Sequence, residues 1–115
     1  MEIKRKKIGS FFNPYGVRIA ILDKKEEAAH AYVYYGLHND LHEKPFAFLE
    51  DVFVEEKFRK RGYGVIIVRI AINEARKKGC YKMILTFRHS KEWLGYFYQQ
   101  FGFESQGNEM RLNLK

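Results

Sequence analysis

The stretch from Phe58 to Gly64, FRKRGYG, holds the residues of this chain that are best suited to binding an anion. Gly62 and Gly64 have no side chain, so the backbone can come close to a ligand. The basic side chains beside them are those of Arg59, Lys60 and Arg61. Because an amphipathic helical pattern begins here, the unpaired N–H groups of its first turn would also point at the ligand. The sequence therefore predicts a phosphate-binding turn.

The spacing of the glycines excludes the two common nucleotide motifs. A Walker A loop needs Gly-Lys followed by Ser or Thr at the start of the helix, whereas Val65 directly follows Gly64. The dinucleotide fingerprint needs a third glycine, and Ile67 occupies that position. A shorter pattern does fit, in which Arg or Gln is followed after two residues by Gly and after one more by Gly or Ala. Arg59, Gly62 and Gly64 stand at its fixed positions.

A sheet and two helices must position this turn. Apolar residues at steps of three and four predict a helix from residue 62 or 63 to 78, closed by Gly79, and a second between Ser90, its N-cap, and Gly102. Alternating apolar, β-branched and aromatic residues predict strands at 17–22, 28–36, 45–54, 81–87 and 109–114. This order predicts an α/β (α+β) fold with helices packed on the faces of the sheet and a ligand crevice near residue 60.

Two acids, Glu50 and Asp51, interrupt the otherwise apolar strand 45–54. Successive side chains of a regular strand point to opposite faces of the sheet. A regular strand would therefore separate the two carboxylates.

Length and composition predict one globular domain, residues 1–115. Hydrophobic residues make up 46% of the 115 and aromatic residues 17%, which is enough for a core. No apolar run approaches the roughly 18 residues that span a bilayer, and the N-terminus has no apolar stretch typical of a signal peptide, so we expect a cytoplasmic location and no membrane partner. Cys80 is the single cysteine and is predicted to be structural. His30, His38, His42 and His89 show no metal-ligand spacing and no nucleophile partner, so no metal is expected.

The charge is unevenly distributed. A net charge of +7 favours an anionic partner. Most of the basic residues lie between residues 55 and 91, whereas residues 38–51 hold four acids and one lysine. This distribution predicts two ligand regions of opposite sign.

The turn pattern, the LEDVFV segment before it and the YFYQQFGF segment at 96–103 together resemble the GNAT superfamily, the acyl-CoA-dependent N-acetyltransferases. The resemblance covers roughly residues 17–114 when the order of the elements is included. FLEDVFV and FYQQFG are most similar to the spermidine/spermine acetyltransferases and their thialysine-using relatives. The resemblance implies a GNAT-like, mostly antiparallel sheet that is N-terminally truncated, because residues 1–16 leave too little chain for the usual first strand and two helices.

The resemblance also implies an acetyl-CoA site built largely from main chain. The pantetheine arm would lie along the end of the strand, with one amide facing the acetyl oxygen, and the turn would hold the pyrophosphate. The residues implied are Val52, Phe53, Val54, Arg59, Lys60, Arg61, Gly62, Tyr63, Gly64 and Val65. Two departures bear on this site. Lys60 stands where many members have glycine, and Lys91 where many have an asparagine that bonds the pantetheine arm.

Two catalytic residues, Glu50 and Tyr98, are implied by the same resemblance. Glu50 would take the proton of the acceptor amine, directly or through water; the alternative is a carboxylate that pairs with a lysine or holds a cationic substrate. Tyr98 would protonate the thiolate of CoA; the alternative is aromatic packing, the role of most of the eight tyrosines. We expect Asp51 to be structural.

The function predicted is acetyl transfer from acetyl-CoA to a primary amine by direct attack in a ternary complex. A small cationic amine such as a polyamine suits the acidic residues Asp40, Glu43 and Glu50. A protein N-terminus or lysine is the enzymatic alternative, and a second subunit, in a homodimer, is one way to complete an open acceptor pocket. The other alternative is a non-enzymatic nucleic-acid- or CoA-binding module, but the basic segments match no nucleic-acid motif of recognised spacing.

Overall fold

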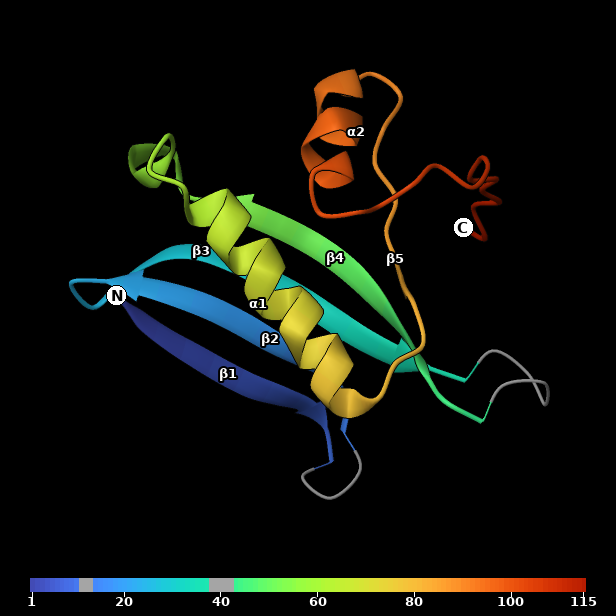
Figure 1. Ribbon diagram of the computed structural model, residues 1–115, viewed down its shortest axis with the longest axis horizontal. Helices are drawn as coiled ribbons and strands as arrows, with labels where there is room; N and C mark the ends of the chain where they lie inside the picture. The colour runs from blue at the N-terminus through green and yellow to red at the C-terminus, as the bar shows by residue number, and fades with distance from the viewer. Residues whose placement is uncertain (11–13, 38–42) are drawn as a thin grey trace. The chain divides into compact units, whose positions relative to one another are not determined.

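The computed structural model describes residues 1–10, 14–37 and 43–115, and it contains two compact units, Met1–Leu85 and Thr86–Lys115 (Figure 1). The first unit holds a five-stranded sheet in the order β1-β2-β3-β4-β5. Its strands are β1 (Glu2–Gly9), β2 (Pro14–Asp23), β3 (Glu26–Gly36), β4 (Phe46–Val54) and β5 (Met83–Ile84). The first four are antiparallel neighbours, and β5 runs parallel to β4. The predicted mixed, mostly antiparallel α/β fold is confirmed.

Strand β1 was not expected from the sequence. Its eight residues, EIKRKKIG, are mostly charged and exposed, so no apolar alternation announces it. An edge strand pairs on one side only and needs backbone hydrogen bonds more than buried side chains. Its pairing with β2, from Glu2 opposite Leu22 to Gly9 opposite Pro14, corrects the expectation that residues 1–16 are too short for a first strand.

One face of the sheet is covered by α1 (Tyr63–Lys78), which crosses β2, β3 and β4 (Figure 1). The largest fully buried side chains are Ile19, Ile21, Val33, Ile67 and Val68, and they form the core between helix and sheet. Helix α1 has the predicted bounds. It ends as predicted at Gly79, whose φ of 85° is the left-handed conformation that favours glycine.

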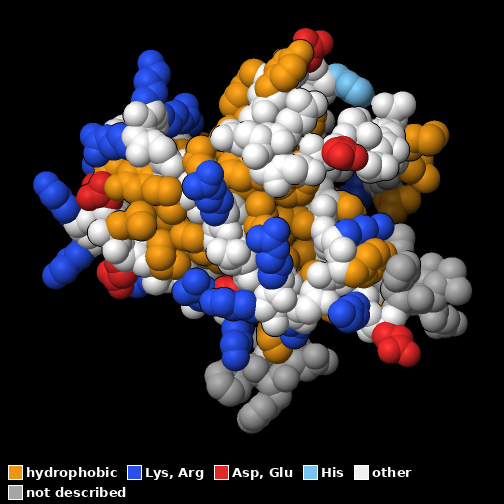
Figure 2. All heavy atoms as spheres, in the orientation of Figure 1, with side chains coloured by type: hydrophobic (Ala, Val, Ile, Leu, Met, Phe, Trp, Pro, Cys, Tyr) orange, Lys and Arg blue, Asp and Glu red, His pale blue; other side chains and the backbone are white. Residues whose placement is uncertain are grey.

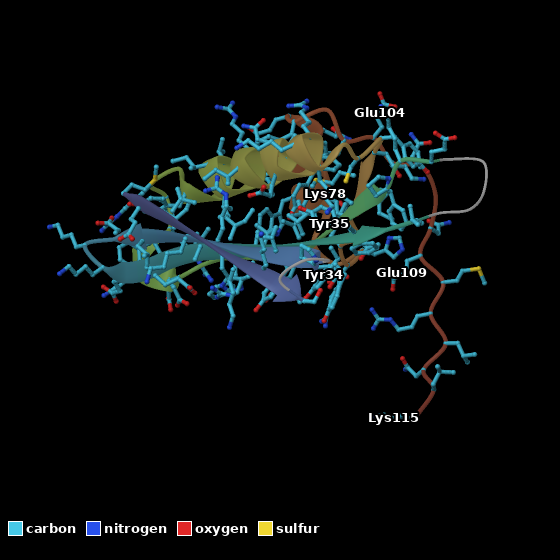
Figure 3. The ribbon with its side chains drawn as sticks, turned by 90° about the horizontal axis from the view of Figure 1, so that it is seen from below. Tyr34, Tyr35, Lys78, Glu104, Glu109 and Lys115 are labelled. Atoms are coloured by element: carbon cyan, nitrogen blue, oxygen red, sulfur yellow. The ribbon has the colours of Figure 1, made fainter. Side chains whose placement is uncertain are left out.

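The opposite face of the sheet carries polar and aromatic side chains. Along β3, Ala29, Ala31 and Val33 are buried, whereas His30, Tyr32 and Tyr34 alternate with them and are partly exposed. Figure 3 shows the two directions at the end of this strand, with Tyr35 on the side of α1, near Lys78, and Tyr34 on the other. In the described part of the first unit the single α-helix covers one face, so His30, Tyr32 and Tyr34 define an open face.

The connection from β4 to α1 contains a short 3-10 helix, η1 (Glu56–Phe58). Phe58 is buried and fixes the start of the FRKRGYG turn to the core. Among the described residues, no helix is both long enough and apolar enough to cross a membrane.

The second unit holds α2 (Glu92–Gln99) and an extended tail, and it differs from the prediction in two ways. The N-cap is Lys91, with no side-chain hydrogen bond, rather than Ser90. Residues 109–114 form no strand, because alternation alone does not make one: their apolar residues Met110, Leu112 and Leu114 are exposed, and no strand in the described part of the chain pairs with them. In the first unit, the predicted strand 81–87 is also shorter than expected, since only the two residues of β5 form a strand.

Replacing Ile67 with Ala tests the packing of α1 on the sheet. The side chain is fully buried, so the change should lower the free energy of unfolding by about 2–5 kcal/mol through lost burial and the cavity left behind. Arg69→Ala, on the exposed side of the same helix, should change it by less than about 0.5 kcal/mol. Chemical denaturation of both variants measures the difference, and equal effects would contradict this packing.

Candidate functional site

Strand β4 contains a bulge at its two acids. His30 of β3 lies opposite Phe53, and Tyr32 lies opposite Glu50, so two steps along β3 face three steps along β4. The extra residue is accommodated where Asp51 adopts a φ of 51°, a left-handed conformation that is uncommon outside glycine. A bulge changes the direction of the side chains that follow it.

Because of the bulge, the side chains of Glu50 and Asp51 lie on the same face of the sheet. Glu50 stands opposite Tyr32 in the strand register, and Asp51 forms a hydrogen bond with His30. Tyr32 and His30 both lie on the open face. Burial, followed by the charges of its neighbours including both carboxylates, raises the pKa of Tyr34 on that face. The separation of the two acids expected for a regular strand does not occur, because β4 is not regular at this point.

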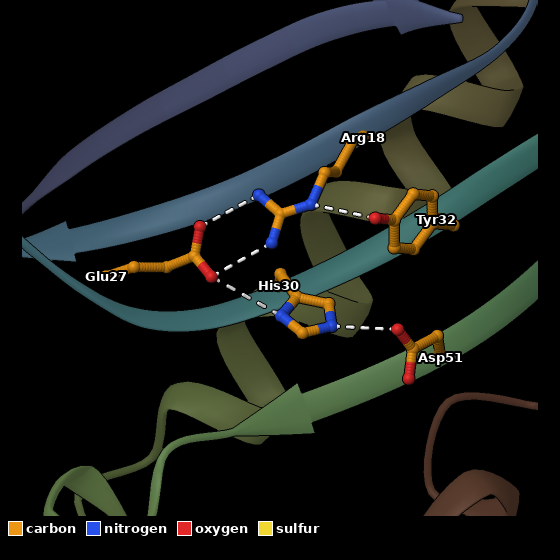
Figure 4. Close-up of polar contacts among 5 residues, drawn as sticks. All are labelled: Arg18, Glu27, His30, Tyr32 and Asp51. Carbon is orange, nitrogen blue, oxygen red and sulfur yellow. Dashed lines mark hydrogen bonds and ion pairs between the residues drawn. The ribbon is translucent and has the colours of Figure 1, made fainter.

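A chain of polar contacts crosses three strands beside the two acids (Figure 4). Arg18 of β2 donates two hydrogen bonds to the Glu27 carboxylate, at 2.8 and 2.9 Å, and a third to the Tyr32 hydroxyl at 3.1 Å. Glu27 Oε2 lies 3.4 Å from His30 Nδ1, and His30 Nε2 lies 3.0 Å from Asp51 Oδ2. The sequence did not predict these carboxylate partners of His30; only the alternation of polar residues in AAHAYVYYG hinted at a shared face.

The ion pair between Arg18 and Glu27 lies at the β2 end of this series of polar contacts. Hydrogen bonds from Arg18 lower the pKa of Glu27, against an opposing effect of burial, and those same bonds raise the pKa of Arg18. Both groups therefore stay ionised at neutral pH and hold one end of the contacts in place.

Beyond its first residues, β4 has an open edge. Its pairing with β5 is limited to Ala47 opposite Met83 and Phe48 opposite Ile84. In the described part of the chain, no strand pairs with the later residues of β4 on that side. Backbone groups of the second half of β4 that point there can bind an extended ligand, much as a further strand would. Val52, Phe53 and Val54, the residues expected to bind pantetheine, belong to this half.

The turn after β4, residues 58–64, has the backbone conformation expected of an anion-binding turn, and we call it the anion turn. Lys60 and Gly62 both have positive φ, 65° and 85°, so Lys60 keeps the left-handed conformation for which many relatives were expected to use glycine. Gly62 is the N-cap of α1, and no side chain caps the helix. The N–H groups of the first helical turn therefore remain available to an anion at the positive end of the dipole.

The side chains of this turn have different roles. The Tyr63 hydroxyl donates a hydrogen bond to Asp23, and its ring packs edge-on against Phe58. Arg59 bends back, donating to the Val54 carbonyl oxygen at 3.0 Å and lying over the Phe53 ring. Lys60 and Arg61 are exposed. Of the three basic residues expected to attract phosphate, Arg59 is thus engaged with β4.

An open groove lies at the other end of β4. Its volume is about 240 Å³, and it is lined by Tyr34, Tyr35, Gly36, Phe46, Phe48 and Glu50. Of the acids expected to suit a cationic acceptor, Asp40 lies outside the described residues and Glu43 is exposed. His38 and His42 also lie outside the described residues. The groove places aromatic faces, which attract cations, beside the Glu50 carboxylate.

Tyr98 belongs to the second unit. It is 8% exposed and packed among rings of its own unit: Phe97 at 5.1 Å, Phe103 at 5.8 Å and Phe87 at 6.4 Å between centroids. Burial raises the pKa of its hydroxyl, which therefore keeps its proton at neutral pH.

Burial likewise raises the pKa of the Cys80 thiol, as suits a structural cysteine. No group of three or more His, Cys, Asp or Glu among the described residues is placed to hold a metal ion.

Comparison with known proteins identifies the family to which this arrangement belongs. The model of the acetyltransferase (GNAT) family matches residues 4–103. The chain belongs to this family. GNAT enzymes use acetyl-CoA as their co-substrate. This chain has the mostly antiparallel sheet of that fold, and its strand β4 has an open edge.

Individual relatives support this assignment. Glucosamine 6-phosphate N-acetyltransferase of Trypanosoma brucei brucei is 38% identical over 66 residues, which are 57% of this GNAT chain and 43% of that protein. The match thus spans less than half of that relative's length. A Trypanosoma brucei acetyltransferase structure has a TM-score of 0.76 at 24% identity, covering 87% of this chain and 70% of the other. Glucosamine-6-phosphate N-acetyltransferase of Arabidopsis thaliana has a TM-score of 0.79 at 18% identity, covering both chains fully. The two structures share the fold.

Replacing Glu27 with Gln tests the charged centre of the contacts. Since the pKa of Glu27 in the folded protein lies below its ordinary value of 4.5, its ion pair stabilises the protein above about pH 4.5 and is lost as the pH falls toward the folded-state pKa. The variant should be less stable at pH 7 by about 1 kcal/mol or less, because the pair is partly exposed. The free energies of unfolding of the wild type and the variant, measured from pH 7 to pH 3, should converge as the pH falls. A difference that stays constant over this range would contradict this role of the ion pair.

Proposed function

We propose that this protein transfers an acetyl group from acetyl-CoA to the primary amine of a small cationic acceptor, by direct attack in a ternary complex. The observation that carries the proposal is the combination at β4, where a bulge directs two carboxylates to one face and an open edge leads into an anion turn. Such a strand can hold a donor along its backbone and a cation beside it.

The donor would be bound mainly by main chain. The pyrophosphate would lie on the N–H groups at the start of α1, between Lys60 and Val65, with Lys60 and Arg61 adding charge. The pantetheine arm would extend along Val52, Phe53 and Val54, where β4 has its open edge. Arg59, which now holds the Val54 carbonyl, would give up that hydrogen bond if the arm took its place.

The acceptor amine would be deprotonated by Glu50, directly or through water, because an ammonium ion is not a nucleophile. Its nitrogen then attacks the thioester carbonyl carbon, and a β4 backbone N–H stabilises the oxyanion. As the C–S bond breaks, Tyr98 gives its proton to the departing thiolate, and the second proton of the attacking nitrogen is lost to water, which leaves the neutral amide. The raised pKa of Tyr98, caused by burial, keeps its proton on the hydroxyl until it is needed.

Two classes of acceptor have support. A polyamine or other small cation suits the paired carboxylates and the aromatic groove next to Glu50. An amino sugar phosphate is the second candidate, because the chain is similar to a glucosamine 6-phosphate N-acetyltransferase. On the described part of the open face, Arg18 is engaged with Glu27, so it is poorly placed to bind a sugar phosphate. We therefore favour the cationic amine.

An assay of CoA release with a panel of acceptors tests this function. The panel contains spermidine, glucosamine 6-phosphate, a peptide with a free N-terminus and a lysine peptide. A reaction without any amine is the control. We expect turnover with spermidine well above that without amine, and acetylated product by mass spectrometry. Preference for glucosamine 6-phosphate would replace the acceptor class, and no turnover with any amine would contradict catalysis.

Replacing Tyr98 with Phe tests the acid role. The variant keeps the ring packing and loses the proton, so kcat should fall by about 10²- to 10⁴-fold, the usual contribution of general acid catalysis, while the Kd for acetyl-CoA stays within about twofold. Tyr96→Phe, at a position 75% exposed, is the matched control and should keep full activity. Full activity in Tyr98→Phe would remove the acid assignment.

Replacing Gly62 with Val tests the anion turn. The φ of 85° at Gly62 is strained for a side chain by about 1–2 kcal/mol, and relaxation of the turn would move the N–H groups that bind phosphate. We expect acetyl-CoA binding to be lost in calorimetry. Gly79→Val imposes the same strain at the other end of α1, where φ is also 85°, and should keep binding; equal losses in the two variants would contradict a specific role for the turn.

A further inference from the structure

We propose that His30 is a positioning residue of the acceptor site, which holds the Asp51 carboxylate on the open face so that Asp51 and Glu50 together receive a cationic acceptor. The inference rests on the proposed function and assigns to it Asp51, which was expected to be structural, and His30, for which the sequence showed no nucleophile partner. It follows from the bulge in β4 and from the contacts shown in Figure 4.

Asp51 needs an external partner to hold its carboxylate in place. Its side chain is 63% exposed, and its backbone is in the left-handed conformation, so packing alone does not fix its direction. The hydrogen bond between His30 Nε2 and Asp51 Oδ2, at 3.0 Å, provides the fixed point. Nε2 carries the proton in this bond, because a carboxylate oxygen can only accept. The second oxygen of Asp51 has no hydrogen bond from the described residues and is available to an acceptor.

His30 itself is held on every side. Its side chain is 15% exposed, with the Phe53 ring stacked at 5.7 Å and the Tyr32 ring edge-on at 5.9 Å between centroids. On the far side its Nδ1 faces Glu27, which Arg18 holds with two hydrogen bonds. The orientation of Asp51 on β4 is thus set by contacts that begin on β2.

One buried atom in this arrangement lacks a hydrogen bond. His30 Nδ1 is buried and makes no hydrogen bond within the described structure, although Glu27 is near it. A buried polar atom without a hydrogen bond costs stability, typically about 1–3 kcal/mol. Nor is His30 placed to act on a substrate directly, since it is largely buried and its Nε2 is occupied. A role through Asp51 explains both features.

Kinetics of four variants test the inference. His30→Phe keeps the ring stacking and removes the Nε2 donor, His30→Gln keeps a donor, Asp51→Asn removes the charge, and the double variant combines His30→Phe with Asp51→Asn. We expect Asp51→Asn and His30→Phe to raise the acceptor KM by about tenfold, with kcat and the Kd of acetyl-CoA within about twofold. His30→Gln should recover most of the loss. His89→Gln, at an exposed histidine of the second unit, is the matched control and should behave as wild type.

The double variant separates positioning from general packing. If His30 acts through Asp51, the double variant loses no more than Asp51→Asn alone, whereas independent roles give multiplied losses. An unchanged KM in His30→Phe, a multiplied loss, or a change confined to acetyl-CoA binding would overturn the inference. Should His30→Phe fail to fold, His30→Leu takes its place in the same cycle. A wild-type protein inactive with every amine refutes the proposed function, whereas an active wild type with an unaffected His30→Phe variant refutes this inference alone.

Discussion

The extra residue in β4 is the constraint on which the rest of the site depends. On one side β4 is paired with β3 along most of its length, and on the other side it meets β5 only at Ala47 and Phe48. The bulge at Asp51 lies just beyond that point. One irregularity therefore coincides with an unpaired edge, two neighbouring carboxylates on one face, and the approach to the anion turn. A regular strand of the same sequence would place Asp51 on the α1 side, against the core.

The surrounding structure holds this irregular strand in place. Behind it, α1 packs on β2, β3 and β4 through fully buried aliphatic side chains such as Ile67 and Val68. The same helix presents its uncapped N-terminus at the turn, so one element both supports the strand and supplies the N–H groups of the proposed anion site. Tyr63 joins that turn to Asp23 at the end of β2. Figure 2 shows the basic side chains on this side of the sheet spread among apolar ones.

Regular periodicity predicted the parts of the fold that are themselves regular. Helix α1, its glycine end and the strands β2, β3 and β4 follow from apolar spacing, because there the side chains decide the structure. Strand β1 did not, since an edge of Lys and Arg residues is formed by backbone pairing that leaves no apolar pattern. Residues 109–114 show the reverse case, alternation without a partner strand. A turn at Gly62 and Gly64 was predictable from the glycines, whereas the left-handed conformation of Lys60 in the same turn has no signal in the sequence. The shared face of the two acids and the contact between His30 and Asp51 depend on a bulge in β4 that no local pattern announces.

Membership of the GNAT family follows from a match to most of the chain, whereas the proposed choice of acceptor rests on few residues. We propose that β4 and the turn after it form one continuous donor site. A ¹H–¹⁵N NMR titration of the protein with acetyl-CoA tests this proposal. We expect the largest amide shift changes at Val52, Phe53 and Val54 and from Lys60 to Val65. Changes confined to β1 and the basic face of α1, or no saturable change at all, would contradict it.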